Sequence, residues 1–178
     1  FVTKGTIKRM ISKANKGSEI VFLGFQTPTK NSYGKFKTAP KGTLIDIIEK
    51  NEPGYSSLNS LSNSGILLAR SDAIADLTQK IKNDNSKQEY YLTDIVKIAA
   101  ASGLSSTYVQ CEEDECLGVN SQLELSVAER KFQDYFRKKL MASGVSMVSP
   151  ETCFFSYDTK IKSGCVIEPN VVFGTGVK

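Results

Sequence analysis

Apolar side chains recur every six residues from position 155 to the end of the sequence. Bulky residues occupy one position of the repeat, at Phe155, Ile161, Ile167 and Phe173, and small or β-branched residues follow each by four, at Thr159, Cys165, Val171 and Val177. A period of six is typical of a hexapeptide β-helix, in which each hexad forms one face of a triangular coil. One turn uses about three hexads, so this segment predicts the first coil of such a solenoid.

A helical pattern comes immediately before the hexads. Ser121 and Glu124 form the S-x-x-E capping box that begins many helices. One apolar face then follows, made of Leu125, Ala128, Phe132, Phe136 and Leu140, and Gly144 ends the pattern. At 1.5 Å per residue, the predicted helix is roughly 30 Å long and connects two parts of the protein.

Strand and helix patterns alternate in the first part of the chain. Strands are predicted at Glu19–Phe25, Gly65–Ala69 and Thr107–Cys111, with a hairpin formed by Tyr33–Thr38 and Thr43–Glu49. Helices are predicted after the capping residues Thr3 and Thr93, the second covering Asp94–Ser102 before Gly103, and a further helix is predicted to start at Ser71. The polar stretch Asn51–Ser64 is predicted to be a loop. This alternation favours an α/β domain with a largely parallel sheet.

Composition narrows the classes of function. The 178 residues have a net charge of +4 spread along the chain, without the basic stripe of a nucleic-acid-binding protein. No apolar run reaches the ~18 residues of a membrane span, and no export signal is visible, so a cytoplasmic protein is expected. The absence of histidine excludes histidine-dependent acid–base chemistry within these residues. Cys111 and Cys116 bracket an acidic run that is expected to be a solvated loop with reduced thiols, because a single C-x₄-C pair is a weak metal signal.

Several longer strings resemble one enzyme family. The segments NDNSKQEYYLTD (83–94), LGVNSQLEL (117–125) and the final IEPNVVFGTGVK are similar to the bacterial bifunctional N-acetylglucosamine-1-phosphate uridylyltransferase / glucosamine-1-phosphate acetyltransferase. The resemblance is collinear over essentially the whole chain and weakest between Asn51 and Ser62. It implies part of a Rossmann-like nucleotidyltransferase domain, a long connecting helix, and the first coil of a left-handed parallel β-helix.

The resemblance also implies residues that bind the sugar of UDP-N-acetylglucosamine. The family's glycine that contacts the acetamido sugar through its backbone corresponds to Gly34, and the I-V-E glutamate that accepts bonds from sugar hydroxyls corresponds to Glu49. Asn63 corresponds to the asparagine of N-T-G, and Thr93 to a threonine that lines the same pocket. The chain departs from the family's pattern at Ser32, Lys35 and Gln88, where the family has glycine, arginine and glycine.

Asn120, in the string GVNS, corresponds to the family's asparagine that binds Mg²⁺ and the nucleotide sugar. Mg²⁺ prefers oxygen ligands, few of them from protein, which an amide oxygen beside one aspartate satisfies. The family's partner aspartate lies in a G-D-x-P motif that would immediately precede this sequence. We therefore expect a piece of a longer protein, with a partial nucleotidyltransferase domain at 1–120, a connecting helix at 121–144 and the start of the β-helix domain at 145–178.

The implied parent enzyme transfers UMP from UTP to N-acetylglucosamine-1-phosphate and acetylates glucosamine-1-phosphate from acetyl-CoA. Its product, UDP-N-acetylglucosamine, is a precursor of peptidoglycan and lipopolysaccharide. The resemblance also implies a homotrimer assembled through the β-helix. The 178-residue piece is expected to be inactive alone, because the nucleotide-binding loop and the acetyl-transfer residues are outside it. Two alternatives stay open: a related nucleotidyltransferase acting on another sugar, and a non-catalytic trimerisation module.

Overall fold

The computed structural model describes residues 2–27, 33–50, 52–58, 61–85, 87–119 and 121–178. The chain divides into two compact units, Phe1–Leu117 and Gly118–Lys178. Each unit has its own hydrophobic core, so the two are described separately.

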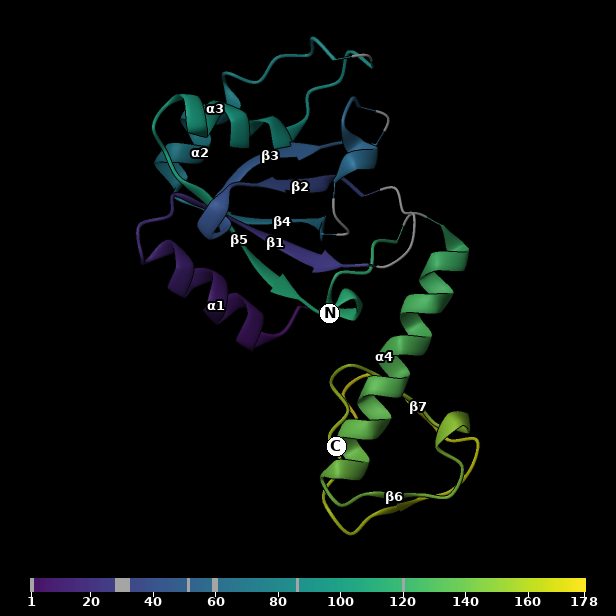
Figure 1. The fold of residues 1–178 in the computed structure, drawn as a ribbon. Coiled ribbons are helices and arrows are strands. Elements are labelled where there is room, and N and C mark those ends of the chain that lie inside the picture. Colours follow the sequence, from purple (N-terminus) through teal and green to yellow (C-terminus); the bar gives the residue numbers. More distant parts are fainter. Residues whose placement is uncertain (1, 28–32, 51, 59–60, 86, 120) are drawn as a thin grey trace. The chain divides into compact units, whose positions relative to one another are not determined.

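The described part of the first unit contains a five-stranded sheet in the order β3-β2-β4-β1-β5 (Figure 1). The strands are β1 (Ile20–Gln26), β2 (Lys35–Thr38), β3 (Leu44–Ile48), β4 (Leu61–Ala69) and β5 (Ser106–Cys111). Only β1 and β5 pair in parallel; β1 with β4, β2 with β4 and β2 with β3 are antiparallel. The prediction of a largely parallel sheet is therefore wrong, while the predicted hairpin is confirmed. The reason is topological, because a short connection such as the one between β2 and β3 joins antiparallel strands, and β4 runs antiparallel to both of its neighbours.

Strand β4 also corrects the predicted loop at Asn51–Ser64. The strand begins at Leu61, and its first residues pair with the end of β1, from Gln26 to Gly24. Leu61, Ser62 and Asn63 are all buried. Their polar composition predicted a loop, yet a strand between two neighbours satisfies its backbone groups whatever its side chains are.

Three helices accompany this sheet: α1 (Lys4–Ala14), α2 (Ser71–Thr78) and α3 (Ile95–Ala101). The Thr3 side chain accepts a hydrogen bond from the Thr6 amide, as predicted for the start of α1. Thr93 does not cap α3 as predicted, because it lies in a 3₁₀ turn, Leu92–Asp94, that precedes the helix. Gly103 has φ of +75° and ends α3, in agreement with the prediction. None of the described helices is long and apolar enough to cross a membrane.

The second unit begins with the predicted long helix, α4 (Gln122–Ala142), whose N-cap Ser121 accepts a bond from the Glu124 amide. The chain that follows, including the hexads, forms short parallel pairs. Strand β6 (Ser146–Met147) pairs with β8 (Val166–Ile167), and β7 (Phe154–Phe155) pairs with β9 (Val172–Phe173). Successive turns of the chain therefore stack in register, as a hexapeptide coil requires. The left hand of the coil stays a prediction.

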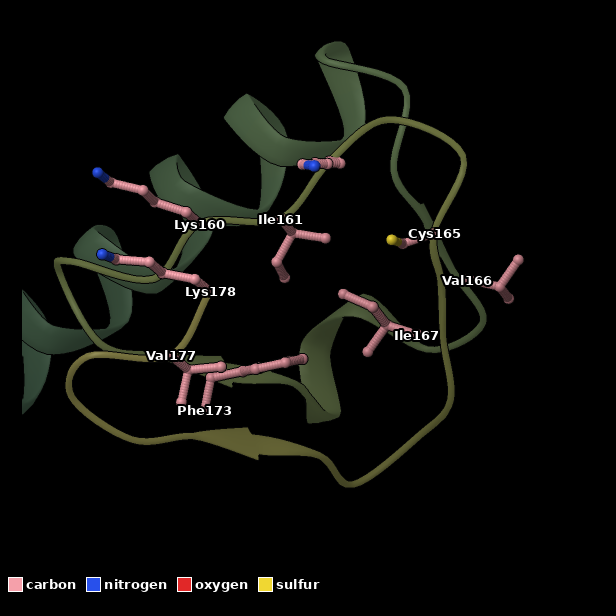
Figure 2. A pocket seen from close by; sticks show the side chains of 9 residues that line it. Lys160, Ile161, Cys165, Val166, Ile167, Phe173, Val177 and Lys178 are labelled. Carbon is pink, nitrogen blue, oxygen red and sulfur yellow. The ribbon is translucent and has the colours of Figure 1, made fainter.

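The inside of the coil is apolar and packs against α4. Phe155 stacks on Phe173 with 5.0 Å between ring centroids and lies 5.7 Å from the ring of Phe136 in α4. Leu125 does not take part in this packing, because it is 49% exposed. Figure 2 shows the far side of the coil, a hollow lined by Ile161, Ile167 and Phe173 with lysines at its rim.

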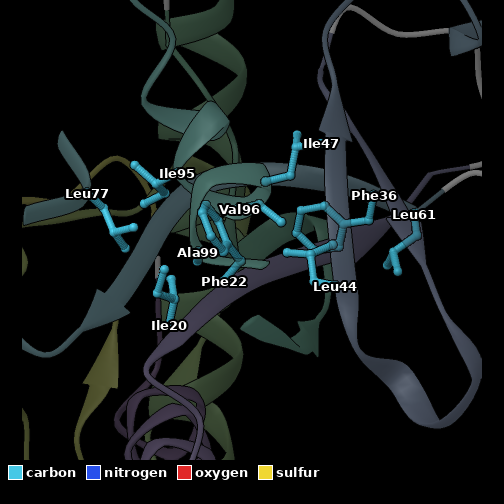
Figure 3. Close-up of a cluster of buried hydrophobic side chains, with 10 residues drawn as sticks. All are labelled: Ile20, Phe22, Phe36, Leu44, Ile47, Leu61, Leu77, Ile95, Val96 and Ala99. Carbon is cyan, nitrogen blue, oxygen red and sulfur yellow. The ribbon is translucent and has the colours of Figure 1, made fainter. Parts of the chain in front are cut away.

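Strand β1 is buried on both faces of the sheet in the first unit. Alternate residues of β1 point to opposite sides: Ile20 and Phe22 pack with α2 and α3, whereas Val21, Leu23 and Phe25 pack on the side of α1. Figure 3 shows the cluster on the α2–α3 side, made of Ile20, Phe22, Phe36, Leu44, Ile47, Leu61, Leu77, Ile95, Val96 and Ala99. This core supports the β2–β3 hairpin, at whose open end the candidate functional residues lie.

Candidate functional site

Gly34 and Glu49 face one another at the open end of the hairpin. Lys35 of β2 pairs with Ile48 of β3, so the residues flanking this pair are brought together. A Cβ atom added to Gly34 would lie 3.0 Å from each carboxylate oxygen of Glu49. That is closer than nearly all side chains approach, so any other residue at position 34 would require the carboxylate to move by a few tenths of an ångström.

Asn63 joins this pair through its backbone. Its amide donates to the Gly34 carbonyl oxygen at 2.7 Å. Its side-chain oxygen Oδ1 accepts from the Gly65 amide at 3.0 Å, and Gly65 has φ of +81°. The side chain is therefore held in a local turn inside β4, while the backbone positions Gly34.

Thr93 completes the group from a distant part of the sequence. Its hydroxyl donates to Oε1 of Glu49 at 3.0 Å. Four of the five residues expected from the resemblance therefore lie together: Gly34, Glu49, Asn63 and Thr93. The fifth, Asn120, lies outside the described residues.

The Glu49 carboxylate lies in an acidic environment. Burial raises its pKa, the Thr93 hydrogen bond opposes this shift, and the charges of Glu52 and Asp94 reinforce it. The Glu49 amide in turn donates to Oε2 of Glu52 at 2.8 Å. Burial also raises the pKa of Asp94, against the opposing charge of Lys97. An ionised carboxylate accepts hydrogen bonds and donates none, so this group suits the uncharged, hydroxyl-rich part of a ligand.

Tyr55 was not predicted from the sequence. It lies in a 3₁₀ turn, Tyr55–Ser57, and its hydroxyl donates to the Tyr33 carbonyl oxygen at 2.9 Å. The ammonium group of Lys35 lies 4.5 Å from the centre of its ring. No sequence signal distinguished this tyrosine, because it stands in the polar stretch where the chain least resembles the family.

Of the three departures from the family's pattern, the structure describes two. Gln88 has φ of +55°, the left-handed conformation that glycine adopts without strain. The resemblance expects glycine there, so the fold keeps the backbone conformation although the residue has changed. Lys35 stands in the contact with Tyr55, and Ser32 lies outside the described residues.

The acidic segment between Cys111 and Cys116 is partly exposed, but the cysteines are buried. Their sulfur atoms are 3.1 Å apart, and burial raises the pKa of Cys111 to about 12. Glu115 is half-buried and accepts bonds from the Thr3 amide and the Thr6 hydroxyl, so the segment holds the start of α1. Within the described residues, no group of three or more His, Cys, Asp or Glu side chains could hold a metal ion.

Comparison with known proteins places this arrangement in context. The chain is 40% identical over its whole length to the bifunctional protein GlmU of Hyphomonas neptunium, of which it covers 39%. It is 42% identical to that of Wolbachia pipientis wMel and 41% identical to that of a Wolbachia from Brugia malayi, covering 41% and 43% of them. The chain thus spans about two fifths of the length of the curated relatives it matches. No family model matches it.

Solved structures agree at the level of the fold. A nucleoside-diphosphate-sugar pyrophosphorylase from Vibrio cholerae superposes with a TM-score of 0.53, 16% identity, and coverage of 72% of this chain and 50% of that one. An apo UDP-glucose pyrophosphorylase superposes with a TM-score of 0.54, 16% identity, and coverage of 77% and 50%. The expected nucleotidyltransferase fold is therefore confirmed.

Proposed function

We propose that this chain, a relative of one segment of the GlmU proteins along its whole length, is the sugar-binding part of a uridylyltransferase joined to the start of an acetyltransferase domain. The longer protein to which it would belong is called the parent protein below. The parent protein transfers UMP from UTP to N-acetylglucosamine-1-phosphate, and it acetylates glucosamine-1-phosphate from acetyl-CoA. Its product would supply peptidoglycan and lipopolysaccharide synthesis.

The close approach of Gly34 to Glu49 carries this proposal. Gly34 has no side chain between its backbone and the Glu49 carboxylate. The hydroxyl of Thr93 donates to one oxygen of this carboxylate. A sugar placed here meets an acceptor for its hydroxyl hydrogens in Glu49, and Gly34 adds no side chain of its own to the site. Asn63 supports the floor of this site through the Gly34 carbonyl.

These residues would contribute to nucleotidyl transfer by positioning the sugar phosphate. In phosphoryl and nucleotidyl transfer the attacking phosphate oxygen must lie in line with the bond that breaks, and holding the sugar fixes that direction. None of the four described residues is assigned a proton-transfer role. The sugar phosphate attacks the α-phosphate of UTP and pyrophosphate leaves; the residues that bind UTP lie outside this chain.

We assign Mg²⁺ to the parent protein, on the resemblance of the string GVNS that contains Asn120. The described residues contain no metal cluster of their own. Asn120 is therefore the single ligand that we assign to this chain, with an aspartate of the parent protein as its partner. When bound, Mg²⁺ would neutralise charge that develops on the phosphates. Acetyl transfer and trimer formation would belong to the complete β-helix.

Titration calorimetry of the parent protein with UDP-N-acetylglucosamine and Mg²⁺ tests the proposal. We expect Glu49→Gln to weaken binding about 10- to 100-fold, the effect of losing a charge-assisted hydrogen bond of ~1.5–3 kcal/mol. Asn120→Ala should abolish the metal dependence of binding. Glu113→Gln makes the same chemical change at an exposed position and should bind normally.

The two alternatives give different results in the same titration. A non-catalytic trimerisation module would not bind the nucleotide sugar at all. A related nucleotidyltransferase would prefer another nucleotide sugar, and Glu49→Gln would weaken that ligand instead.

A further inference from the structure

The segment Tyr33–Lys35 is held by contacts from two other parts of the first unit. From β4, the Asn63 amide donates to the Gly34 carbonyl. From the connection between β3 and β4, Tyr55 makes two contacts: its hydroxyl donates to the Tyr33 carbonyl, and its ring lies beneath the Lys35 ammonium. Tyr55 therefore holds the residue on each side of Gly34.

This arrangement fixes Gly34 directly beside the Glu49 carboxylate. The carboxylate oxygens of Glu49 are 3.0 Å from the place where a Gly34 side chain would begin. A movement of the segment therefore changes the space between the Gly34 backbone and the carboxylate. Binding sites depend on such placement, and a misplacement of ~1 Å can reduce activity by about 10²-fold.

The contacts of Tyr55 are also electrostatically linked to the site. Burial raises the pKa of its hydroxyl, and the negative charge of Glu49 raises it further. The hydroxyl consequently stays protonated and keeps donating to Tyr33. The ring offers its negative face to the Lys35 ammonium, a contact that orders a long and otherwise mobile side chain.

We infer that Tyr55 is a positioning residue, which holds Gly34 against Glu49 and so sets the affinity of the site for the sugar phosphate. It acts through the Tyr33–Lys35 segment and needs no contact with the ligand. This inference rests on the proposed function for the identity of the ligand, but the geometry on which it depends can be tested without any ligand.

The test compares Tyr55→Phe, which loses the hydroxyl bond and keeps the ring, with Tyr55→Leu, which loses both contacts. In steady-state assays of the parent protein, we expect Tyr55→Phe to raise the KM for N-acetylglucosamine-1-phosphate about fivefold, the effect of one neutral hydrogen bond. Tyr55→Leu should raise it by about 10- to 30-fold, because the cation–π contact is lost as well. The KM for UTP should not change, and Tyr157→Phe, at an exposed tyrosine of the second unit, should match the unmodified protein.

A second measurement uses no ligand. Hydrogen exchange of the Asn63 amide reports the bond to Gly34, and we expect it to be about fivefold faster in Tyr55→Phe. This variant keeps the size of the ring, so it decides the question even if Tyr55→Leu does not fold.

The outcomes separate the two proposals. If Glu49→Gln raises the sugar-phosphate KM and Tyr55→Phe does not, Tyr55 is not a positioning residue and the proposed function stands. If Glu49→Gln has no effect on this KM, the proposed function fails, and the exchange of the Asn63 amide alone judges Tyr55. A parallel rise in both KM values with a lower melting temperature would show a general structural role and overturn the inference.

Discussion

Among the residues of the site, Glu49 has the environment that best indicates what the site does. It is half-buried among other acids, and Thr93 is the donor that binds it. Burial is unfavourable for a charge, so the folded protein raises the pKa of Glu49 above its ordinary value of 4.5. A carboxylate whose burial raises its pKa in this way is typical of binding rather than of structural support.

A pH dependence of stability follows. Because the folded pKa is raised, the contribution of Glu49 to stability is present below its unfolded pKa and is lost as the pH rises through the folded pKa. Glu49→Gln removes this loss and can keep the Thr93 bond. We expect the variant to gain stability over the unmodified chain as the pH rises from about 4 to 7, measured by urea unfolding. A difference that does not change with pH, or that shrinks as the pH rises, would contradict this prediction.

Single residues differed in how far the sequence identified them. Gly34, Glu49 and Thr93 came from the resemblance, and the structure brings them together. The local pattern of Thr93 pointed to a helix cap instead, because a threonine before a helical run has the same appearance whether its hydroxyl binds an amide or a distant carboxylate. Tyr55 had no signal, since its role depends on contacts with residues about twenty positions earlier in the chain.

Among the elements, α4 closes one end of the coil. The side-chain amide of Gln133, in α4, donates to the Phe155 carbonyl at 2.8 Å and accepts from the Phe155 amide at 2.9 Å. It pairs with both backbone groups of this residue, as a neighbouring strand would. Gln133 is 4% exposed, so these bonds are shielded from water.

Replacing this amide should destabilise the second unit. Gln133→Met keeps the length of the side chain but leaves two buried backbone groups of Phe155 without partners. We expect a loss of about 2–6 kcal/mol in the free energy of unfolding, from ~1–3 kcal/mol for each group. Urea unfolding and hydrogen exchange of the Phe155 amide measure it. The matched control is Gln122→Met, at an exposed position of the same helix; equal effects of the two changes would refute the bridging role.

The elements of the second unit followed the sequence closely, and those of the first unit did so less. A capping box, an apolar face and a period of six are local signals, and each formed the predicted structure. The direction of the strands is not a local property. Strand β4 lies between β1 and β2 and runs antiparallel to both. The polar residues at the start of β4 did not indicate this position or this direction.

For the whole molecule, the share of the relatives that the chain covers leads to a prediction. It aligns with about two fifths of GlmU proteins, and we propose that UTP binds to the part outside this alignment. We expect the 178-residue chain by itself to release no pyrophosphate from UTP and N-acetylglucosamine-1-phosphate, measured with a coupled phosphate assay. The parent protein is the positive control, and turnover by the chain alone above background would contradict the prediction.

The repeat of six, the long helix before it, the nucleotidyltransferase fold class and the family resemblance could all be predicted from the sequence, because periodicity and motif strings are properties of residues near one another in the chain. The three-dimensional fold was needed to establish that the sheet is mixed, that the Glu49 carboxylate lies against Gly34, and that Tyr55 contacts the residues on each side of Gly34. Those features join residues from separate strands and turns. They depend on how the strands pair and on which side chains the core brings to the open end of the hairpin, and no local pattern records either.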